Sequence, residues 1–240
     1  MGTYQIVTDS TADLTPELIR QLDVQVIPLC YMMGGRTYHN IPGGGEMTDR
    51  EFYAKLRGGA MSTTTQINSE EFLRVFTPLL EAGQDVLYIA FSSGLSGTCQ
   101  SAQLAREELQ KRFPQRKMVV FDSLCASMGE GLLVYYAAKL RQEGKSLEEV
   151  LAWLQENVLR LCHWFTVDDL NHLKRGGRVS TATALVGTML GIKPVLHVDD
   201  EGHLIPVSKV RGRKQSLDAL VKRMEETAQE PAGQMVFISH

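Results

Sequence analysis

Short apolar runs alternate with amphipathic stretches through the first two-thirds of the chain. This pattern is typical of a parallel sheet covered by helices on both faces. Strands are predicted at residues 4–8, 24–32, 86–91 and 118–121. Helices are predicted at residues 16–22, 49–56, 69–81, 95–112, 124–143 and 147–161. The first helix has the clearest start signal, because Thr15 suits an N-cap and Pro16 suits the first helical position.

The pattern changes after residue 161, where strand-like stretches at 163–167, 193–198 and 204–210 surround a Gly-rich segment. A small-residue helix is expected from Thr181, and residues 199–202 form a turn signal between the last two of these strands. The fold class is therefore expected to be α/β. It comprises a three-layer α/β/α domain with a parallel sheet over residues 1–161 and an α+β domain with a mixed sheet over residues 162–240.

The chain ends on a strand-like run at residues 235–240. Nothing follows that could cover such a strand, so we expect the second domain to be shortened at its C-terminus.

Composition narrows the possible partners and the compartment. The net charge of −3, from 25 basic and 28 acidic residues, provides no basic stripe for nucleic acid or for anionic membrane. The four cysteines lie far apart without a CxxC pair, which is typical of reduced thiols in the cytoplasm. No apolar stretch approaches the length of a membrane span, so no stable membrane anchor is expected.

Two loops rich in hydroxyl groups follow predicted strands and lead into predicted helices. The first contains Asp9 and Ser10, and the second contains Ser92, Ser93, Gly94 and Ser96. Ligands of open parallel sheets gather at the carboxyl ends of the strands, where the winding reverses. If the first strand lies between the second and the third, these loops flank that point. Hydroxyl donors, free backbone amides and a helix N-terminus would then suit a carboxylate or a phosphate.

Simpler roles for the same residues stay open. Ser10, Ser92 and Ser93 could serve only as helix caps. A third hydroxyl cluster, at residues 62–66, precedes the helix at 69–81, where Asn68 or Ser69 could be the cap.

A catalytic function has weaker support in the sequence. The segment around Ser96 lacks the final Gly of a nucleophile elbow, and no Asp and His stand out as partners. No P-loop, GxGxxG or HExxH motif occurs, so no nucleotide cofactor or catalytic metal is predicted. His197 and His203 could face each other across the turn, but a histidine pair without a third ligand is more often a surface feature.

Charged groups in the second domain offer further alternatives. Basic residues at 174–178 and 209–214 could grip an anion, or could be solvated loop charges. Asp168 and Asp169 suit helix capping better than paired acid–base catalysis.

Five motifs, taken in order, resemble the DegV family over essentially the whole chain. They are TDSTADLTPE at residues 8–17, TTTQ at 63–66, SSGLSGT at 92–98, DLNHLKRGGRVS at 169–180 and GIKPVL at 191–196. The combination of SSGLSGT with LKRGGRVS is far more specific than either motif alone.

The resemblance implies a two-domain protein that buries a long-chain fatty acid between its domains. It also implies a carrier without catalytic residues, cofactor or metal, which presents the lipid carboxylate to a separate ATP-dependent fatty acid kinase subunit in the bacterial cytoplasm. Carried over by motif, the carboxylate ligands are Ser93 and Thr64 or Thr65, with Ser92 and Gly94 beside them and Arg211 as the basic residue. Asp9, Ser10 and Ser96 are expected in the pocket loops.

Two departures from the family pattern bear on this site. Ile67 stands where the family usually has Pro, which leaves the register of Thr63, Thr64 and Thr65 open. Family members also continue into a motif with His and Gly-Pro beside the carboxylate, and this chain does not contain that motif. The competing functions are a hydrolase or transferase acting on a small phosphorylated or acyl substrate, and a regulatory protein that only senses lipid.

Overall fold

The computed structural model describes residues 4–179 and 191–240. The chain divides into two compact units, the first comprising Met1–Val158 with Phe237–His240 and the second comprising Leu159–Val236. The first unit thus ends near the predicted domain change at residue 161, and it also includes the last residues of the chain.

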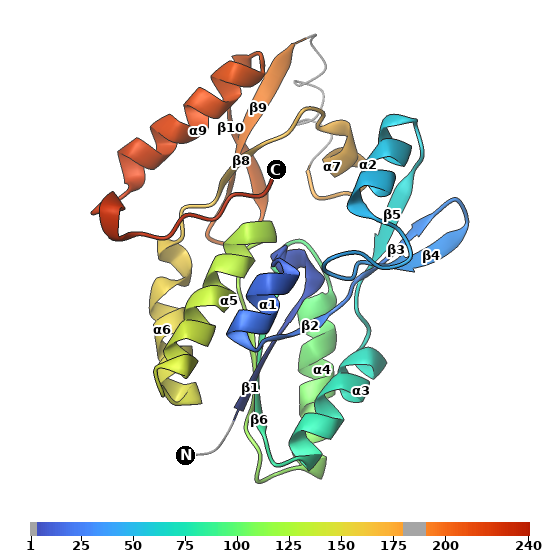
Figure 1. The fold of residues 1–240 in the computed structure, drawn as a ribbon, viewed down its shortest axis with the longest axis vertical. Coiled ribbons are helices and arrows are strands. Elements are labelled where there is room, and N and C mark those ends of the chain that lie inside the picture. The colour runs from blue at the N-terminus through green and yellow to red at the C-terminus, as the bar shows by residue number, and fades with distance from the viewer. Residues whose placement is uncertain (1–3, 180–190) are drawn as a thin grey trace. The chain divides into compact units, whose positions relative to one another are not determined.

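A four-stranded parallel sheet forms the centre of the first unit (Figure 1). Its strands are β1 (Tyr4–Asp9), β2 (Gln25–Ile27), β6 (Asp85–Ala90) and β7 (Met118–Asp122), in the order β2-β1-β6-β7. β1 pairs in parallel with both β2 and β6. The first strand therefore lies between the second and the third, as the argument for a ligand site requires, and the winding reverses at β1.

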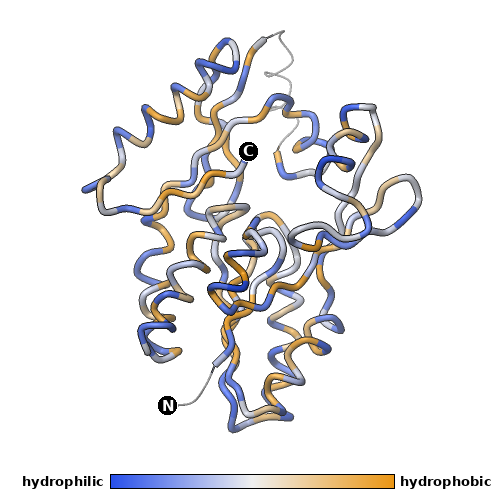
Figure 2. The backbone as a smooth tube through the Cα atoms, in the orientation of Figure 1, coloured by the Kyte–Doolittle hydropathy of each residue, from blue (hydrophilic) through white to orange (hydrophobic). Residues whose placement is uncertain are grey.

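Helices cover both faces of this sheet. Their bounds are α1 (Pro16–Leu22), α3 (Ser69–Glu81), α4 (Thr98–Arg112), α5 (Ser127–Gln142) and α6 (Leu147–Asn157), the last followed by the 3-10 turn η2 (Val158–Arg160). Helices α3 and α4 pack together on one face, and α1 and α6 pack on α5 at the other. The strands between them are largely hydrophobic in Figure 2. Phe72, Phe76 and Tyr88 are fully buried and pack ring against ring, with centroids 5.0 to 5.9 Å apart.

A small antiparallel sheet interrupts the α/β alternation. It consists of β3 (Cys30–Met33), β4 (Arg36–His39) and β5 (Ser62–Thr65) in the order β4-β3-β5, and α2 (Asp49–Arg57) connects β4 to β5. The prediction of one strand over residues 24–32 was wrong, because β2 and β3 belong to different sheets. Pro28 stands between them and has no backbone N–H to continue a ladder.

Two helices begin later than predicted. The segment after β6 first makes a tight turn, in which the backbone N–H groups of Leu95 and Ser96 both donate to the carbonyl of Ser92, and α4 begins only at Thr98. In the segment after β7, Leu124 has a left-handed φ of 51° and Ala126, the N-cap residue, is extended, so residues 124–126 are not helical and α5 begins at Ser127.

The second unit contains an antiparallel sheet. Its strands are β8 (Trp164–Thr166), β9 (Ile192–Val198) and β10 (Leu204–Arg211) in the order β10-β9-β8, and both pairings are antiparallel where a mixed sheet was predicted. Helix α9 (Arg213–Thr227) packs on all three strands, and the short helix α7 (Asn171–Arg175) follows β8. The predicted turn is present, because the N–H of Gly202 donates to the carbonyl of Asp199 at 2.9 Å. The helix predicted from Thr181 lies outside the described residues.

The strand predicted over residues 235–240 does not form. After the 3-10 turn η3 (Pro231–Gly233), residues 234–240 pair with none of the described strands. Phe237 instead packs edge-on against Tyr135 of α5, with ring centroids 5.4 Å apart.

Candidate functional site

The two hydroxyl-rich loops lie at the carboxyl ends of neighbouring strands. The turn η1 (Ser10–Ala12) follows β1 directly, and the segment from Ser92 to Gly97 connects β6 to α4. Because β1 and β6 are paired in parallel, both loops emerge at the same edge of the sheet. The candidate site is therefore built on two adjacent strands, as the sequence predicted.

The backbone amides of the second loop are used internally. Ser93 N donates to the Asp122 carboxylate at 3.2 Å, and Gly94 N donates to the Ser92 hydroxyl at 3.2 Å. Thr98 N donates to the Ser96 hydroxyl at 3.2 Å. The prediction that free amides here bind an anion was therefore wrong for these positions. These three N–H groups are therefore not available to an anion.

The two adjacent serines differ in their surroundings. Ser92 is completely buried, and its hydroxyl caps the turn by accepting from Gly94 N. Ser93 is exposed, and its hydroxyl has no hydrogen-bond partner among the described residues. Neither serine is a helix cap, because α4 begins at Thr98 with Gly97 as its N-cap residue. Of the two hydroxyls, that of Ser93 is available to a ligand.

The first loop is directed inward. Asp9 is buried, and its carboxylate accepts hydrogen bonds from the Tyr88 hydroxyl at 2.7 Å, from Thr11 N at 3.0 Å and from Phe91 N at 3.3 Å. Burial raises the pKa of Asp9 against the lowering effect of these bonds. The Ser10 hydroxyl accepts from Leu29 N at 3.0 Å. In the described structure both side chains hold the framework of the site.

The third hydroxyl cluster joins the second loop through Gln66 and Ile67. Ile67 N donates to the Thr98 hydroxyl at 3.3 Å, and the Gln66 side chain donates to Ser101 at 3.3 Å. A Cβ atom added at Gly97 would overlap the Gln66 side chain, so glycine at this position permits the close approach. The two motifs, distant in sequence, therefore meet at the start of α4.

The ladder of the small sheet fixes the register of the threonines. Thr64 lies opposite Tyr31 and Thr65 lies opposite Cys30, whose carbonyl accepts from the Thr65 hydroxyl at 3.3 Å. Successive side chains of a strand point to opposite faces, so Thr64 and Thr65 serve different faces of this sheet. Both are exposed.

Comparison with known proteins gives a consistent family. The model of the DegV family, described as a family of uncharacterised proteins, matches residues 3–240. A DegV domain-containing protein of Clostridium perfringens is 44% identical over 241 residues, covering 100% of this chain and 82% of the relative. The chain belongs to the DegV family. A DegV domain-containing protein of Lactococcus lactis is 47% identical over 93% of this chain and 77% of its own.

Solved DegV structures share the fold. The structure of a DegV family protein from Thermus thermophilus, described as fatty acid binding, has a TM-score of 0.82 at 39% identity, over 95% of this chain and 79% of its own. DegV of Bacillus subtilis, described as a fatty acid binding protein, has a TM-score of 0.79 at 31% identity, over 94% of this chain and 78% of its own. These agreements confirm the predicted family and fold class.

In this DegV chain Arg211 belongs to the second unit, whereas the loops described above belong to the first. It is the exposed last residue of β10 in the second unit, opposite Ile192. Its part in binding stays a prediction from the resemblance. Of the two neighbouring acids, Asp169 accepts from Asn171 N at 2.8 Å at the start of α7, whereas Asp168 pairs with Lys193 at 2.9 Å. The N-cap position of α7 is Leu170, without a side-chain cap, so neither acid is the helix cap that was predicted, although Asp169 binds the first N–H of the helix.

The two histidines of the β9–β10 hairpin do not form a pair. His197 bonds to the carbonyl of His163 at 2.9 Å and stacks on Trp164. His203 lies beside Asp199 and Glu201, at 3.7 Å from each. Among the described residues, no group of three or more potential ligands could hold a metal ion.

Ser96 has the surroundings of a turn residue. Its hydroxyl lies 2.9 Å from the Thr98 hydroxyl and accepts from Thr98 N. An activated nucleophile would instead have a base within hydrogen-bond reach.

Sequence reasoning overlooked Asp122 and Glu130 in this DegV chain. Asp122 ends β7, so the rule that ligands collect at carboxyl ends of strands would have drawn attention to it. Glu130 lies in a stretch of α5 that is otherwise small or apolar, and a buried Glu without a basic partner is rare. A single acidic residue in such a stretch is the only local signal in the sequence, because the residues that contact Glu130 are distant in sequence.

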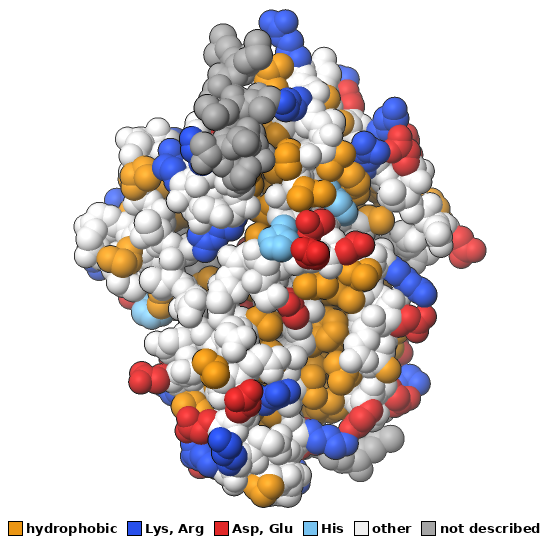
Figure 3. Space-filling model, turned by 180° about the vertical axis from the view of Figure 1, so that it is seen from behind, with side chains coloured by type: hydrophobic (Ala, Val, Ile, Leu, Met, Phe, Trp, Pro, Cys, Tyr) orange, Lys and Arg blue, Asp and Glu red, His pale blue; other side chains and the backbone are white. Residues whose placement is uncertain are grey.

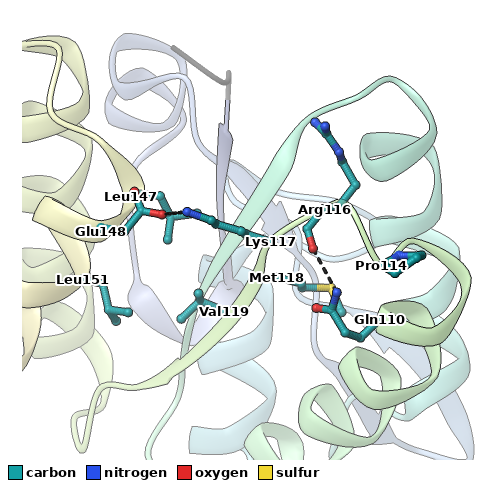
Figure 4. A pocket seen from close by; sticks show the side chains of 9 residues that line it. All are labelled: Gln110, Pro114, Arg116, Lys117, Met118, Val119, Leu147, Glu148 and Leu151. Carbon is teal, nitrogen blue, oxygen red and sulfur yellow. Dashed lines mark hydrogen bonds and ion pairs between the residues drawn. The ribbon is translucent and has the colours of Figure 1, made fainter.

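A groove of about 500 Å³ lies away from these loops, at the start of β7 (Figure 4). It is lined by Gln110, Pro114, Arg116, Lys117, Met118, Val119, Leu147, Glu148 and Leu151. Lys117 forms an ion pair with Glu148 across it, and Gln110 donates to the carbonyl of Arg116 at 3.0 Å. Since parallel strands begin at the edge opposite to their carboxyl ends, this groove is separate from the hydroxyl loops.

The surface carries charges of both signs. Lysine and arginine side chains are interspersed with aspartate and glutamate on the face in Figure 3, in line with the net charge of −3. In the ranges 4–179 and 191–240, no helix is both long enough and apolar enough to span a bilayer.

Proposed function

We propose that this DegV chain binds a long-chain fatty acid and that the hydroxyl of Ser93 donates a hydrogen bond to its carboxylate. The observation that carries the proposal is the kinship with fatty-acid-binding DegV proteins at 39% and 31% identity. The site supports it, because Ser93 is exposed at the carboxyl edge of the sheet while its backbone N–H is already bound to Asp122. Its hydroxyl can therefore turn to a ligand without loss of an internal bond.

The neighbouring residues have different parts in this proposal. Thr64 and Thr65 are the second source of hydroxyl groups. Their side chains point to opposite faces of β5, so one of the two can face the carboxylate. Ser92, Gly94 and Ser96 shape the loop that presents Ser93.

The energetics suit a carrier. Each methylene removed from water contributes about 0.8 kcal/mol, so an acyl chain supplies most of the affinity without catalytic machinery. A charge-assisted hydrogen bond adds about 1.5–3 kcal/mol and fixes which end of the lipid is held. We further propose that the chain works in the cytoplasm and presents the carboxylate to a separate ATP-dependent kinase, which converts it to an acyl phosphate.

The proposal is tested by titrating delipidated protein calorimetrically with a long-chain fatty acid and with its methyl ester. The acid is expected to bind at least tenfold more tightly, because the ester oxygens are weaker acceptors for Ser93 than a carboxylate is. Absence of binding, or equal affinity for the two ligands, would contradict the proposed site.

A further inference from the structure

Glu130 is a fully buried carboxyl group without a cation beside it. It lies in the first turns of α5, and its side chain contacts two hydroxyls of the first loop. Oε1 lies 2.9 Å from the hydroxyl of Thr8, and Oε2 lies 2.8 Å from the hydroxyl of Thr11. Gly131 allows this approach, because a Cβ atom there would overlap the carbonyl oxygen of Ala12.

Both threonine hydroxyls have a second partner. The Thr8 hydroxyl lies 2.9 Å from the carbonyl oxygen of Ile89, which can only accept. The Thr11 hydroxyl lies 2.5 Å from Asp9 Oδ1, so it stands between two carboxyl groups. A hydroxyl has one hydrogen and can donate to one of them. The contact with the other carboxyl group needs a proton on that carboxyl.

The hydrogen-bond pattern therefore requires at least one proton on Asp9 or Glu130. Asp9 has other donors aimed at it, namely the Tyr88 hydroxyl and the backbone N–H groups of Thr11 and Phe91, and these favour its charged form. Glu130 contacts only hydroxyl groups in the described structure. The proton belongs on Glu130, with Thr11 donating onward to Asp9.

The electrostatic surroundings agree with this assignment. Burial, followed by the charge of Asp9, raises the pKa of Glu130 well above its ordinary value of 4.5. The titratable groups that interact with Glu130 or with Asp9 are Asp13, Tyr88, Cys99 and Cys125, and Asp122 acts on both cysteines. None of these is a cation that would favour a charged Glu130.

We propose that Glu130 is neutral in the folded protein and is a positioning residue for the ligand-binding loop. Through Thr8 and Thr11 it fixes the turn that carries Asp9. The Asp9 carboxylate in turn binds the N–H of Phe91, two residues before Ser93. A neutral Glu130 also keeps a second negative charge away from the edge of the sheet, where the proposed function, on which this role rests, places a lipid carboxylate.

The protonation state is tested without ligand, by the pH dependence of unfolding in denaturant. A carboxyl with a raised pKa binds its proton more tightly in the folded state, so stability falls as pH rises above 4.5. The test compares the equilibrium constant for folding of the parent with that of Glu130→Gln. The ratio of parent to variant is expected to fall about tenfold for each pH unit between pH 4.5 and the pKa of Glu130 in the folded protein. A ratio that does not change with pH overturns the proposal.

A matched control is Glu149→Gln on α6. Hydrogen bonds from Ser146 lower the pKa of Glu149, so relative to this variant the folding constant of the parent should not fall as the pH rises. The infrared band of a protonated buried carboxyl group should be present in the parent and in Glu149→Gln, and absent from Glu130→Gln. Its persistence in Glu130→Gln overturns the assignment to Glu130.

The positioning role is tested with palmitate as the ligand at neutral pH. Glu130→Gln, which stays neutral and keeps polar contacts, is expected to bind within about threefold of the parent, whereas Glu130→Leu loses about tenfold or more. Thr11→Val, which retains Glu130, should lose affinity as Glu130→Leu does. Equal affinity of all variants overturns the role. If neither the parent nor any variant binds palmitate, the proposed function fails. The pH test without ligand still decides whether Glu130 is protonated.

Discussion

At the scale of single residues, the loop after β6 separates structural from ligand-directed hydroxyls. Ser92 and Ser96 use their hydroxyls to hold the turn, and Asp122 holds the backbone of Ser93. The Ser93 hydroxyl alone among these three serines has no internal bond in the described part of the chain. Replacing it should therefore affect ligand binding and leave the fold intact.

Ser93→Ala is expected to weaken fatty-acid binding by roughly ten- to a hundredfold, the effect of losing one charge-assisted hydrogen bond. The thermal midpoint of the lipid-free protein should change little, because the Asp122 bond to Ser93 N does not involve the hydroxyl. Calorimetric titration and a thermal scan measure the two quantities. A lower midpoint with unchanged affinity would assign Ser93 a structural role instead.

Ser92→Ala is the matched control. It removes a buried acceptor of the Gly94 N–H, so the midpoint should fall. An unsatisfied buried group costs about 1–3 kcal/mol.

The thiols should differ in reactivity for physical reasons. Burial raises the pKa of Cys99 and of Cys125 to about 12, which keeps both as unreactive thiols near neutral pH. Cys162 is exposed. We expect fast modification of Cys162 by a disulfide reagent at pH 8, while Cys99 and Cys125 react only after unfolding. In the variant Cys162→Ser no fast modification of Cys99 or Cys125 should be seen, and a fast phase at either of these buried cysteines would contradict the packing.

At the scale of elements, the close contact between α5 and η1 depends on Gly131. A Cβ atom there would overlap the carbonyl oxygen of Ala12, which is backbone and has little freedom to move. Gly131→Ala should therefore destabilise the fold by about 1–3 kcal/mol, despite the better helix propensity of alanine. Denaturant unfolding measures this change.

Gly233→Ala is the control for steric overlap, since an added Cβ has open space there. It should be nearly neutral. Equal effects of the two substitutions would contradict the proposed contact of α5 with the first loop.

Elements with strong local signals were predicted well from the sequence. α1 begins at Pro16 with Thr15 as its N-cap, and the Thr15 side chain accepts from Leu18 N. α3 has the bounds predicted for it, with Asn68 as the cap. Capping, periodicity and proline act within one or two helical turns, so they are visible in the sequence itself.

The features that were missed depend on distant contacts. The pairing of β3 with β4 and β5 assembles a separate sheet that apolar periodicity alone does not reveal. The loop at Ser93 was placed correctly at the sheet edge, but the direction of its amides depends on Asp122, some thirty residues away. The buried Glu130 likewise owes its surroundings to β1 and η1. Tertiary context overrides local preference at such positions.

At the scale of the whole molecule, the proposed function is to hold one end of a lipid, and neither Ser93 nor Ser96 in the described loop after β6 has a base as the hydrogen-bond partner of its hydroxyl. The hydroxyls of the site cap turns or face outward, and the serine in the best position for a nucleophile, Ser96, has another hydroxyl as its partner. In the proposed function, a separate kinase supplies the chemistry.

Binding of a fatty acid by this chain can be measured by extracting the protein, purified from a heterologous host, under denaturing conditions and analysing the extract by mass spectrometry. We expect one long-chain fatty acid, saturated or monounsaturated, per protein molecule. We also expect the delipidated protein to reload with the same acid and Ser93→Ala to retain less of it. A preparation that contains no fatty acid and cannot be loaded with any would show that the chain is not a fatty acid carrier.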